Sequence, residues 1–315
     1  MSDTLGPLRS RPGVIRLYGH RGCRGLMPEN TLESFRHTLS LGIRAIEIDV
    51  LATRDGVPVV THNPRLLADS TRDPDGRWLE GEGPRIHELT YQELQGYDVG
   101  ALRPGSAYAD LFPEQAVMPG LRVPAFAAVA ALAAEPANAD VWLNVEIKSD
   151  PGDPANTPPI PEFVRGVLTP IWRARIADRV LLQSFDWRIL AEIRRQAPGL
   201  PLSYLTYLDQ PRRPPTPNIW AGSPWMAGHA LADHGGSLPR TIAAAGGQAW
   251  APHYSDINRP LLEEARALGL LVNVWTANAP ADIDRMIALG VDGIITDYPG
   301  RAQRRLMAFG LDWRG

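Results

Sequence analysis

The sequence predicts an α/β fold, a (β/α)8 TIM barrel, on the basis of two observations. Short β-branched runs alternate with longer segments of helical period from about residue 15 onward. This alternation is typical of βα units around a parallel sheet. Polar side chains also lie at the ends of several runs, where such barrels place their sites. We therefore expect residues 1–315 to form one barrel domain.

Nine segments qualify as strands, one more than the barrel needs. They lie near residues 15–19, 45–50, 58–62, 141–148, 180–185, 201–207, 248–254, 271–277 and 293–299. The 58–62 run follows Asp55-Gly56, a hairpin signal, so it should pair antiparallel with the end of 45–50 or continue it. Eight strands then remain for the barrel.

Helical segments with apolar residues at i, i+3 and i+4 separate most of these strands. The clearest are 31–41, 186–196, 260–268 and 279–289. Gly42 and Gly290 follow two of them, as C-terminal capping glycines would. These helices are expected to cover the outside of the sheet.

Three segments lack a regular period. The proline-rich stretches 151–161 and 211–217 follow strands and are expected to be loops. Residues 63–123 contain much Gly, Pro, Asp and Arg, with a short helix predicted at 90–95. We expect this segment to be a small insertion over the active-site face of the barrel. The N-terminal residues 1–9 look like a short mobile arm.

Composition and charge exclude several classes of function. The net charge is −3, from 32 basic and 35 acidic residues without clusters, so no nucleic-acid partner is expected. A single cysteine, Cys23, permits no intramolecular disulfide and fits a cytoplasmic location. We find no signal peptide and no apolar run of the ~18 to 20 residues that a transmembrane helix needs.

Two carboxylates of the second predicted strand should point to one face. Side chains alternate along a strand, so Glu47 and Asp49 face one way and Ile48 the other. Acids pointing into a barrel are costly without a cation, and oxygen ligands suit Mg2+ or Ca2+ better than Zn2+. A solvated acidic patch is the alternative, which the apolar neighbours of these acids disfavour.

The strand near 141–148 repeats this arrangement, with Asn144, Glu146 and Lys148 on one face. Glu146 can complete a three-carboxylate metal site. Lys148 and Arg21 would then hold a phosphate by charge and by paired hydrogen bonds. An ion pair between Glu146 and Lys148 that only seals the barrel is the alternative.

His20 and His62 each end a predicted strand and are expected at the same mouth of the barrel. Two imidazoles beside a metal-bound phosphodiester can share acid–base work, since their usual pKa of ~6.5 suits both roles. Which is the acid and which the base is left open here. Trp275 could close over the carbon part of a substrate or belong to the core. Weaker candidates for the mouth are Gln183, Phe185, His253 and Asp297.

The order and spacing of these residues resemble the glycerophosphodiester phosphodiesterase family over about residues 15–300. The matching segments are Gly19-His20-Arg21-Gly22, Pro28-Glu29-Asn30-Thr31, Glu47-Ile48-Asp49-Val50, Asp55 to His62, Glu88-Leu89-Thr90, Asn144 to Lys148, Gln183-Ser184-Phe185, Asn273 to Thr276 and Gly293 to Pro299.

This resemblance implies hydrolysis of a small glycerophosphodiester to an alcohol and glycerol 3-phosphate with Mg2+ or Ca2+. It also implies that the glycerol 2-hydroxyl attacks phosphorus and that water opens the resulting cyclic phosphate. The implied roles are metal binding by Glu47, Asp49 and Glu146, acid–base catalysis by His20 and His62, and substrate binding by Arg21, Lys148 and Trp275.

The chain departs from the family pattern in two places. Asn63 replaces the usual Asp after His62, and Ala125 to Ala128 replace an acidic pair in a segment expected to begin a helix outside the mouth. Two other functions stay open. One is cleavage of lysophospholipids by a lysophospholipase D-like enzyme, with Ile219, Trp220, Trp225 and Met226 as an apolar rim. The other is a weakly active phosphoester-binding protein.

Overall fold

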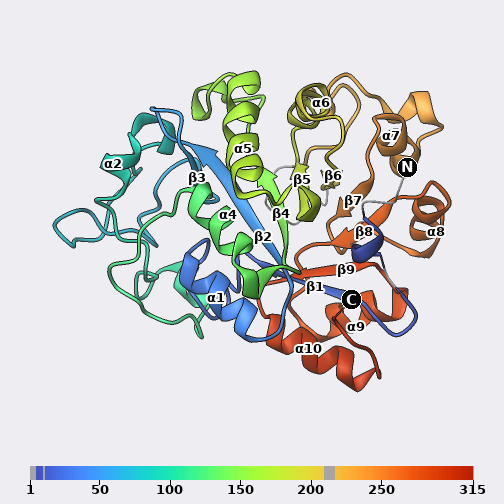
Figure 1. The fold of residues 1–315 in the computed structure, drawn as a ribbon, viewed down its shortest axis with the longest axis horizontal. Helices are drawn as coiled ribbons and strands as arrows, with labels where there is room; N and C mark the ends of the chain where they lie inside the picture. Colours follow the sequence, from blue (N-terminus) through green and yellow to red (C-terminus); the bar gives the residue numbers. More distant parts are fainter. Residues whose placement is uncertain (1–4, 10, 209–216, 315) are drawn as a thin grey trace.

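The computed structural model describes residues 5–9, 11–208 and 217–314. Nine strands form one sheet in the order β1-β9-β8-β7-β6-β5-β4-β2-β3, and pairing of β1 with β2 closes it. Eight parallel strands make the barrel, with helices around it (Figure 1). The predicted (β/α)8 barrel is confirmed. The ninth strand, β3, pairs antiparallel with β2. This is one of the two arrangements expected for the 58–62 run, the other being a continuation of the preceding strand.

The nine predicted strand segments correspond to the nine strands, with ends that differ by a few residues. The strands are β1 (Arg16–His20), β2 (Ala45–Ala52), β3 (Pro58–Val60), β4 (Trp142–Ile147), β5 (Val180–Ser184), β6 (Leu202–Thr206), β7 (Ala249–Pro252), β8 (Leu271–Val274) and β9 (Gly293–Thr296). The helices are α1 (Leu32–Ser40), α2 (Tyr91–Leu94), α3 (Ala107–Leu111), α4 (Phe126–Ala134), α5 (Ile160–Ala174), α6 (Trp187–Gln196), α7 (Leu238–Ala244), α8 (Arg259–Ala267), α9 (Pro280–Leu289) and α10 (Pro299–Ala308).

The alternation of side chains along β2 divides its residues between two environments. All eight residues are buried. Ile46, Ile48 and Val50 point outward and pack in the apolar layer between the sheet and the helices. Glu47 and Asp49 point inward and lie beside Asn144 and Glu146 of β4 in the strand register. Alternation therefore gives the barrel an apolar outside and a polar interior at this end.

Local signals explain where the helices begin and end. Thr31 caps α1 by accepting a hydrogen bond from the backbone of Ser34, and Gly290 ends α9 in the left-handed region at φ +83°. The predicted loop 151–161 contains a short 3-10 helix, Pro154–Asn156, and its last residues already belong to α5. Proline is tolerated in the first turn of a helix, which explains that difference. Of the stretch 211–217, only Pro217 lies within the described residues.

The end of the barrel opposite the predicted site is filled by apolar side chains. Tyr18, Trp142 and Leu181 pack there with Leu5 and Leu8 from the N-terminal segment. The prediction of a mobile arm is therefore wrong for residues 5–8, which include a 3-10 helix (Gly6–Leu8). Two leucines spaced three residues apart put both side chains on one face of that turn, so both are buried.

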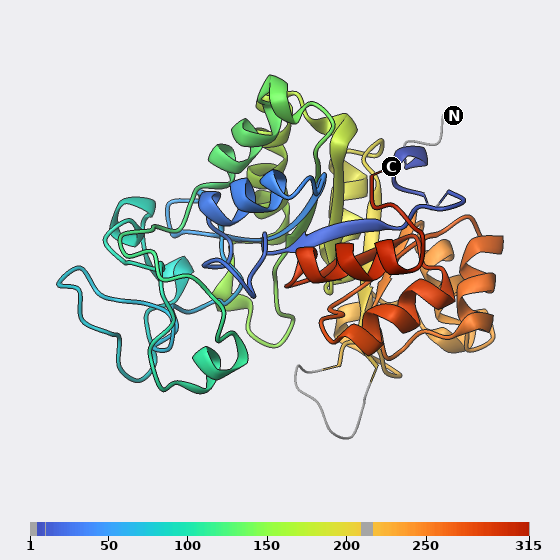
Figure 2. The same cartoon turned by 90° about the horizontal axis from the view of Figure 1, so that it is seen from below.

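The segment between β3 and α4 forms the expected insertion. In Figures 1 and 2 it lies at one side of the barrel, away from the C-terminal helices α7 to α10. It has a small apolar core of its own, in which Leu66, Ile86 and Leu94 pack against Leu51 and Val59 of the β2–β3 hairpin. Across the described parts of the chain, no helix combines the length and the apolar character required to span a bilayer.

Candidate active site

A cavity of about 580 Å³ opens at the C-terminal ends of the barrel strands. Seven of the eight predicted site residues line it, and the eighth, Asp49, contacts two of them. The lining members are His20, Arg21, Glu47, His62, Glu146, Lys148 and Trp275. The fold thus brings together residues that are up to 255 positions apart in the sequence.

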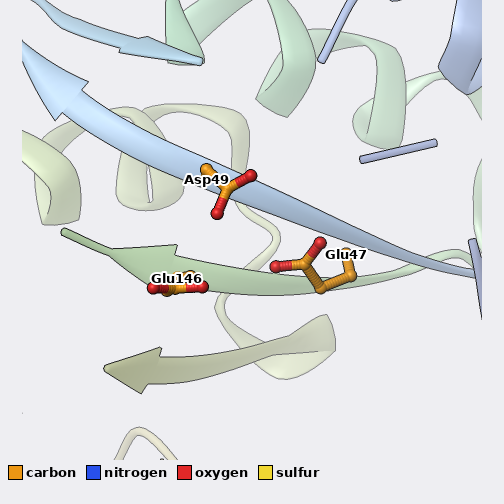
Figure 3. A group of neighbouring side chains, drawn as sticks. All are labelled: Glu47, Asp49 and Glu146. Carbon is orange, nitrogen blue, oxygen red and sulfur yellow. The ribbon is translucent and has the colours of Figure 1, made fainter. Parts of the chain in front are cut away.

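Three carboxylates gather inside this mouth. Glu47 and Asp49 lie on β2 and Glu146 lies on the neighbouring strand β4 (Figure 3). One oxygen from each lies within 4.8 Å of the others, and all three side chains are buried. A cluster of buried carboxylate oxygens of this size could hold a hard divalent cation.

The charges of the triad are poorly balanced by the protein alone. Burial and the neighbouring carboxylates of Asp49 and Glu146 raise the pKa of Glu47 well above its ordinary value. Burial likewise raises the pKa of Glu146 to about 7. Burial would also raise the pKa of Asp49, but Lys148 and Arg21 outweigh it and hold that pKa well below its ordinary value. The pKa of one carboxylate is therefore held low, whereas the pKa values of Glu47 and Glu146 are raised, the latter in spite of the attraction of Lys148.

The environment of Asp49 fits a cation as well. Among the described residues, no hydrogen bond of good geometry reaches its Oδ1 atom, although Lys148 Nζ lies 3.0 Å away. Its Oδ2 atom accepts a hydrogen bond from Asn30 at 3.0 Å. A buried oxygen with an unused lone pair, beside two acids whose pKa values are raised by burial, suits a metal ligand.

Lys148 and Arg21 border the triad as fixed positive charges. Lys148 Nζ lies 2.6 Å from Glu146 Oε1, and Arg21 Nε lies 3.1 Å from Asp49 Oδ2. Burial by itself would lower the pKa of Lys148, but Asp49 and Glu146 outweigh it and raise that pKa. The ion pair between Lys148 and Glu146, considered as an alternative to phosphate binding, is therefore present. Because both residues line the cavity, the pair also faces any ligand there.

His20 is held by an extended polar network. Its Nδ1 atom lies 2.6 Å from Asp297 Oδ1, and its Nε2 atom lies 3.8 Å from Glu47 Oε2. Arg24 donates to both carboxylate oxygens of Asp297, at 2.9 and 3.0 Å, and Asn278 donates to Oδ2 at 2.6 Å. Burial would raise the pKa of Asp297, but Arg24 and His20 hold it far below its ordinary value. An ionised Asp297 accepts the Nδ1 proton of His20, so Nε2 is the atom left to exchange a proton.

Tyr108 of the insertion joins this network to the arginine beside the triad. Arg24 Nη1 donates to the Tyr108 hydroxyl at 3.3 Å, and that hydroxyl donates to Glu29. Glu29 in turn accepts from Arg21 Nη1 at 2.9 Å. The insertion thereby fixes groups on two sides of the cavity. Sequence reasoning gave no role to Arg24 or Tyr108, nor to Glu29, which it placed only in a segment that matches the family. No local pattern connects a tyrosine at 108 with residues 24 and 29.

His62 has a different and simpler environment. It follows the antiparallel strand β3, and its Nδ1 atom lies 3.1 Å from Asn63 Oδ1. Burial lowers its pKa well below the ordinary value, and Arg21 and Lys148 add to that effect. A neutral amide therefore orients this imidazole, whereas a carboxylate orients His20.

Aromatic side chains form part of the cavity wall. Trp275 is half-buried and donates from its indole Nε1 to Ala251 O at 2.9 Å. Phe185 packs edge-on against it with ring centroids 5.2 Å apart. Trp225 also lines the cavity, but Ile219 and Met226 are buried in the core. The predicted apolar rim is therefore wrong for those two residues and leaves Trp220 and Trp225.

Comparison with known proteins decides the family. The profile of the Glycerophosphoryl diester phosphodiesterase family matches residues 20–301. The chain belongs to this family. Its named relatives are glycerophosphodiester phosphodiesterases, which are phosphoric diester hydrolases, and this member is one as well.

Relatives of this family member span nearly its whole length. A glycerophosphodiester phosphodiesterase from Caldanaerobacter subterraneus subsp. tengcongensis is 29% identical, over 89% of this chain and 93% of the relative. A solved structure from Silicibacter pomeroyi, provisionally named a glycerophosphoryl diester phosphodiesterase, is 44% identical with a TM-score of 0.87 and covers 98% and 99% of the two chains. An Oleispira antarctica phosphodiesterase has the same fold, with 21% identity, a TM-score of 0.65 and 93% and 97% coverage.

Proposed function

We propose that this member of the family hydrolyses glycerophosphodiesters to an alcohol and glycerol 3-phosphate. In this proposal Glu47, Asp49 and Glu146 hold Mg2+ or Ca2+, and His20 and His62 are the acid–base pair. The observation that carries it is one cavity lined by two imidazoles, two fixed cations and two members of a buried acidic triad. The Oleispira phosphodiesterase was solved with sn-glycerol-3-phosphate as its product, which agrees with the proposed product.

The proposed chemistry divides proton transfer between the two imidazoles. One takes the proton of the glycerol 2-hydroxyl as its oxygen bonds to phosphorus, and the other gives a proton to the alcohol oxygen as its bond to phosphorus breaks. Water then opens the cyclic phosphate with the two roles exchanged. Bound in the triad, a divalent cation would offset charge on the phosphoryl oxygens. Arg21 and Lys148 would hold the same oxygens by charge-assisted hydrogen bonds.

Metal removal tests the central part of this proposal. We expect EDTA treatment to abolish release of glycerol 3-phosphate from glycerophosphocholine, and Mg2+ or Ca2+ to restore it. Undiminished turnover after exhaustive chelation and dialysis would exclude the metal role of the triad. The same assay with a lysophospholipid distinguishes the lysophospholipase D-like reaction from the proposed one. Its product would be lysophosphatidic acid instead of glycerol 3-phosphate.

The two rival functions have less support from the geometry. Of the four expected rim residues only Trp225 lines the cavity, and Trp220 is exposed but is not part of the cavity lining. A weakly active binding protein was suggested by Asn63, but two histidines line the cavity and the three acids cluster together, which supports an enzyme. The buried, single Cys23 is compatible with a cytoplasmic setting, which we include in the proposal.

Asp297 gives a separate prediction, because it is a positioning residue for His20. Asp297→Asn should lower kcat by about 10- to 100-fold with little change in KM, since an amide can no longer stabilise the protonated imidazole. The measurement is steady-state kinetics at several pH values. Asp284→Asn, at a surface ion pair with Arg305, is the matched control and should leave kcat unchanged. Equal kcat in both variants would show that His20 does not depend on Asp297.

A further inference from the structure

The loop between β4 and α5 contributes a second group of polar side chains to the cavity. Asn156 and Thr157 lie at the end of the 3-10 helix Pro154–Asn156, and both line the cavity. They are only 8% and 9% exposed. They are therefore buried side chains that belong to the cavity wall and not surface residues near its rim.

Neither side chain has a hydrogen-bond partner among the described residues, whereas three neighbouring polar side chains of that wall have one. Gln183 donates to Glu47, Ser184 donates to Ile147 O, and Ser149 donates to Asp186. For Asn156 the structure provides only backbone bonding, from its N–H to Asp153 O. Their polar atoms are not among the solvent-inaccessible atoms without a partner, so the amide and the hydroxyl are open to the cavity and available to hydrogen-bond a ligand there.

The rest of this wall indicates what kind of ligand fits. The aromatic rings of Phe185, Trp225 and Trp275 offer apolar faces to a carbon skeleton. The one carboxylate of this loop that lines the cavity is Asp150, whose Oδ1 atom accepts a hydrogen bond from Gly152 N at 2.7 Å. Hydroxyl groups on a carbon skeleton would find both unpaired hydrogen-bonding groups and ring faces.

We propose that Asn156 and Thr157 form a subsite for the leaving alcohol and that this alcohol is a polyol, such as glycerol or inositol. The inference rests on the proposed function, because it assigns the part of the substrate beyond the phosphate. The glycerol that supplies the attacking hydroxyl has to lie at the histidines and the triad. A cavity of about 580 Å³ is within the range of pockets for larger ligands and leaves room for a second alcohol.

The test compares two diesters that differ only in their alcohol. Thr157→Val keeps the shape of the side chain and removes its hydroxyl, and Asn156→Ala removes the amide. Each should lower kcat/KM for glycerophosphoinositol by about 3- to 10-fold, the effect of one lost hydrogen bond, and change that for glycerophosphocholine less than about 2-fold. Thr169→Val on α5, outside the cavity, is the matched control and should affect neither.

Two results would overturn the subsite. One is an equal loss on both diesters, which would place these residues at the shared glycerol phosphate, and the other is no loss on either. A wild-type protein that hydrolyses neither diester would refute the proposed function separately. In that case calorimetric binding of glycerophosphoinositol to the metal-free protein still tests the subsite: Thr157→Val must weaken binding relative to the wild type and to Thr169→Val. Equal affinities in all three would overturn it.

Discussion

Replacing His20 by alanine should lower kcat by about 1,000-fold or more without unfolding the protein. The reason is that general acid–base catalysis contributes about 100- to 10,000-fold, and no neighbouring side chain can replace the lost imidazole. Asp297 keeps Arg24 and Asn278 as partners, so the carboxylate stays compensated when His20 is removed. The measurement is kcat at saturating metal and diester, with a thermal melt to check folding.

His62→Ala should have an effect of the same size, and the double variant should lose little more than either single one. Groups that act in one proton-transfer cycle are strongly non-additive. His37→Ala on α1, which is outside the cavity, is the matched histidine control. Wild-type kcat in His20→Ala or in His62→Ala would remove that residue from the acid–base pair.

Glu146→Gln should lower activity by about 1,000-fold and, at the same time, stabilise the metal-free protein. Burial raises the pKa of Glu146 from 4.5 to about 7. An acid with a raised folded-state pKa contributes most to stability below pH 4.5, and that contribution is lost as the pH rises through 7. At pH 8 the metal-free wild type therefore contains an unfavourable buried charge, which glutamine removes.

Thermal melts in EDTA at pH 5 and pH 8 measure this effect. The Tm of Glu146→Gln should exceed that of the wild type by a few degrees at pH 8, and the gap should narrow at pH 5. Added Mg2+ or Ca2+ should raise the Tm of the wild type more than that of the variant. Glu82→Gln, at an exposed position, should behave like the wild type throughout. A lower Tm of Glu146→Gln than of the wild type at pH 8 would contradict the idea that the buried charge of Glu146 destabilises the metal-free protein.

The parts of the site that could be predicted from sequence are those set by alternation along strands. Glu47, Asp49 and Glu146 were assigned to one face by the period of two, and neighbouring strands then brought them together. The resemblance to the family added the pairing of His20 with His62. The fold followed from the same periodicities, including the hairpin signal Asp55-Gly56 before β3.

The parts that could not be predicted depend on tertiary contacts without a local period. Asp297 was only a weak candidate, because its bond to His20 joins residues 277 positions apart. Tyr108 lies in an insertion whose sequence has little regular pattern. The prolines near 151–161 indicated a loop, but not that Asn156 and Thr157 are buried. Leu5 and Leu8 belonged to a segment too short to show whether it packs on the barrel.

The hairpin that carries His62 makes the proposed acid–base pair of His20 and His62 dependent on two hydrophobic cores. His20 ends a barrel strand, whereas His62 follows β3, whose Val59 packs with the insertion. The insertion core is much smaller than the layer between the sheet and the helices, so we expect it to open at a lower free energy. Mild heat or denaturant would then separate the two imidazoles while the barrel is still folded. Inactivation would then precede unfolding of the barrel. The loss of turnover would show that the insertion has unfolded before any spectroscopic signal of the barrel changes.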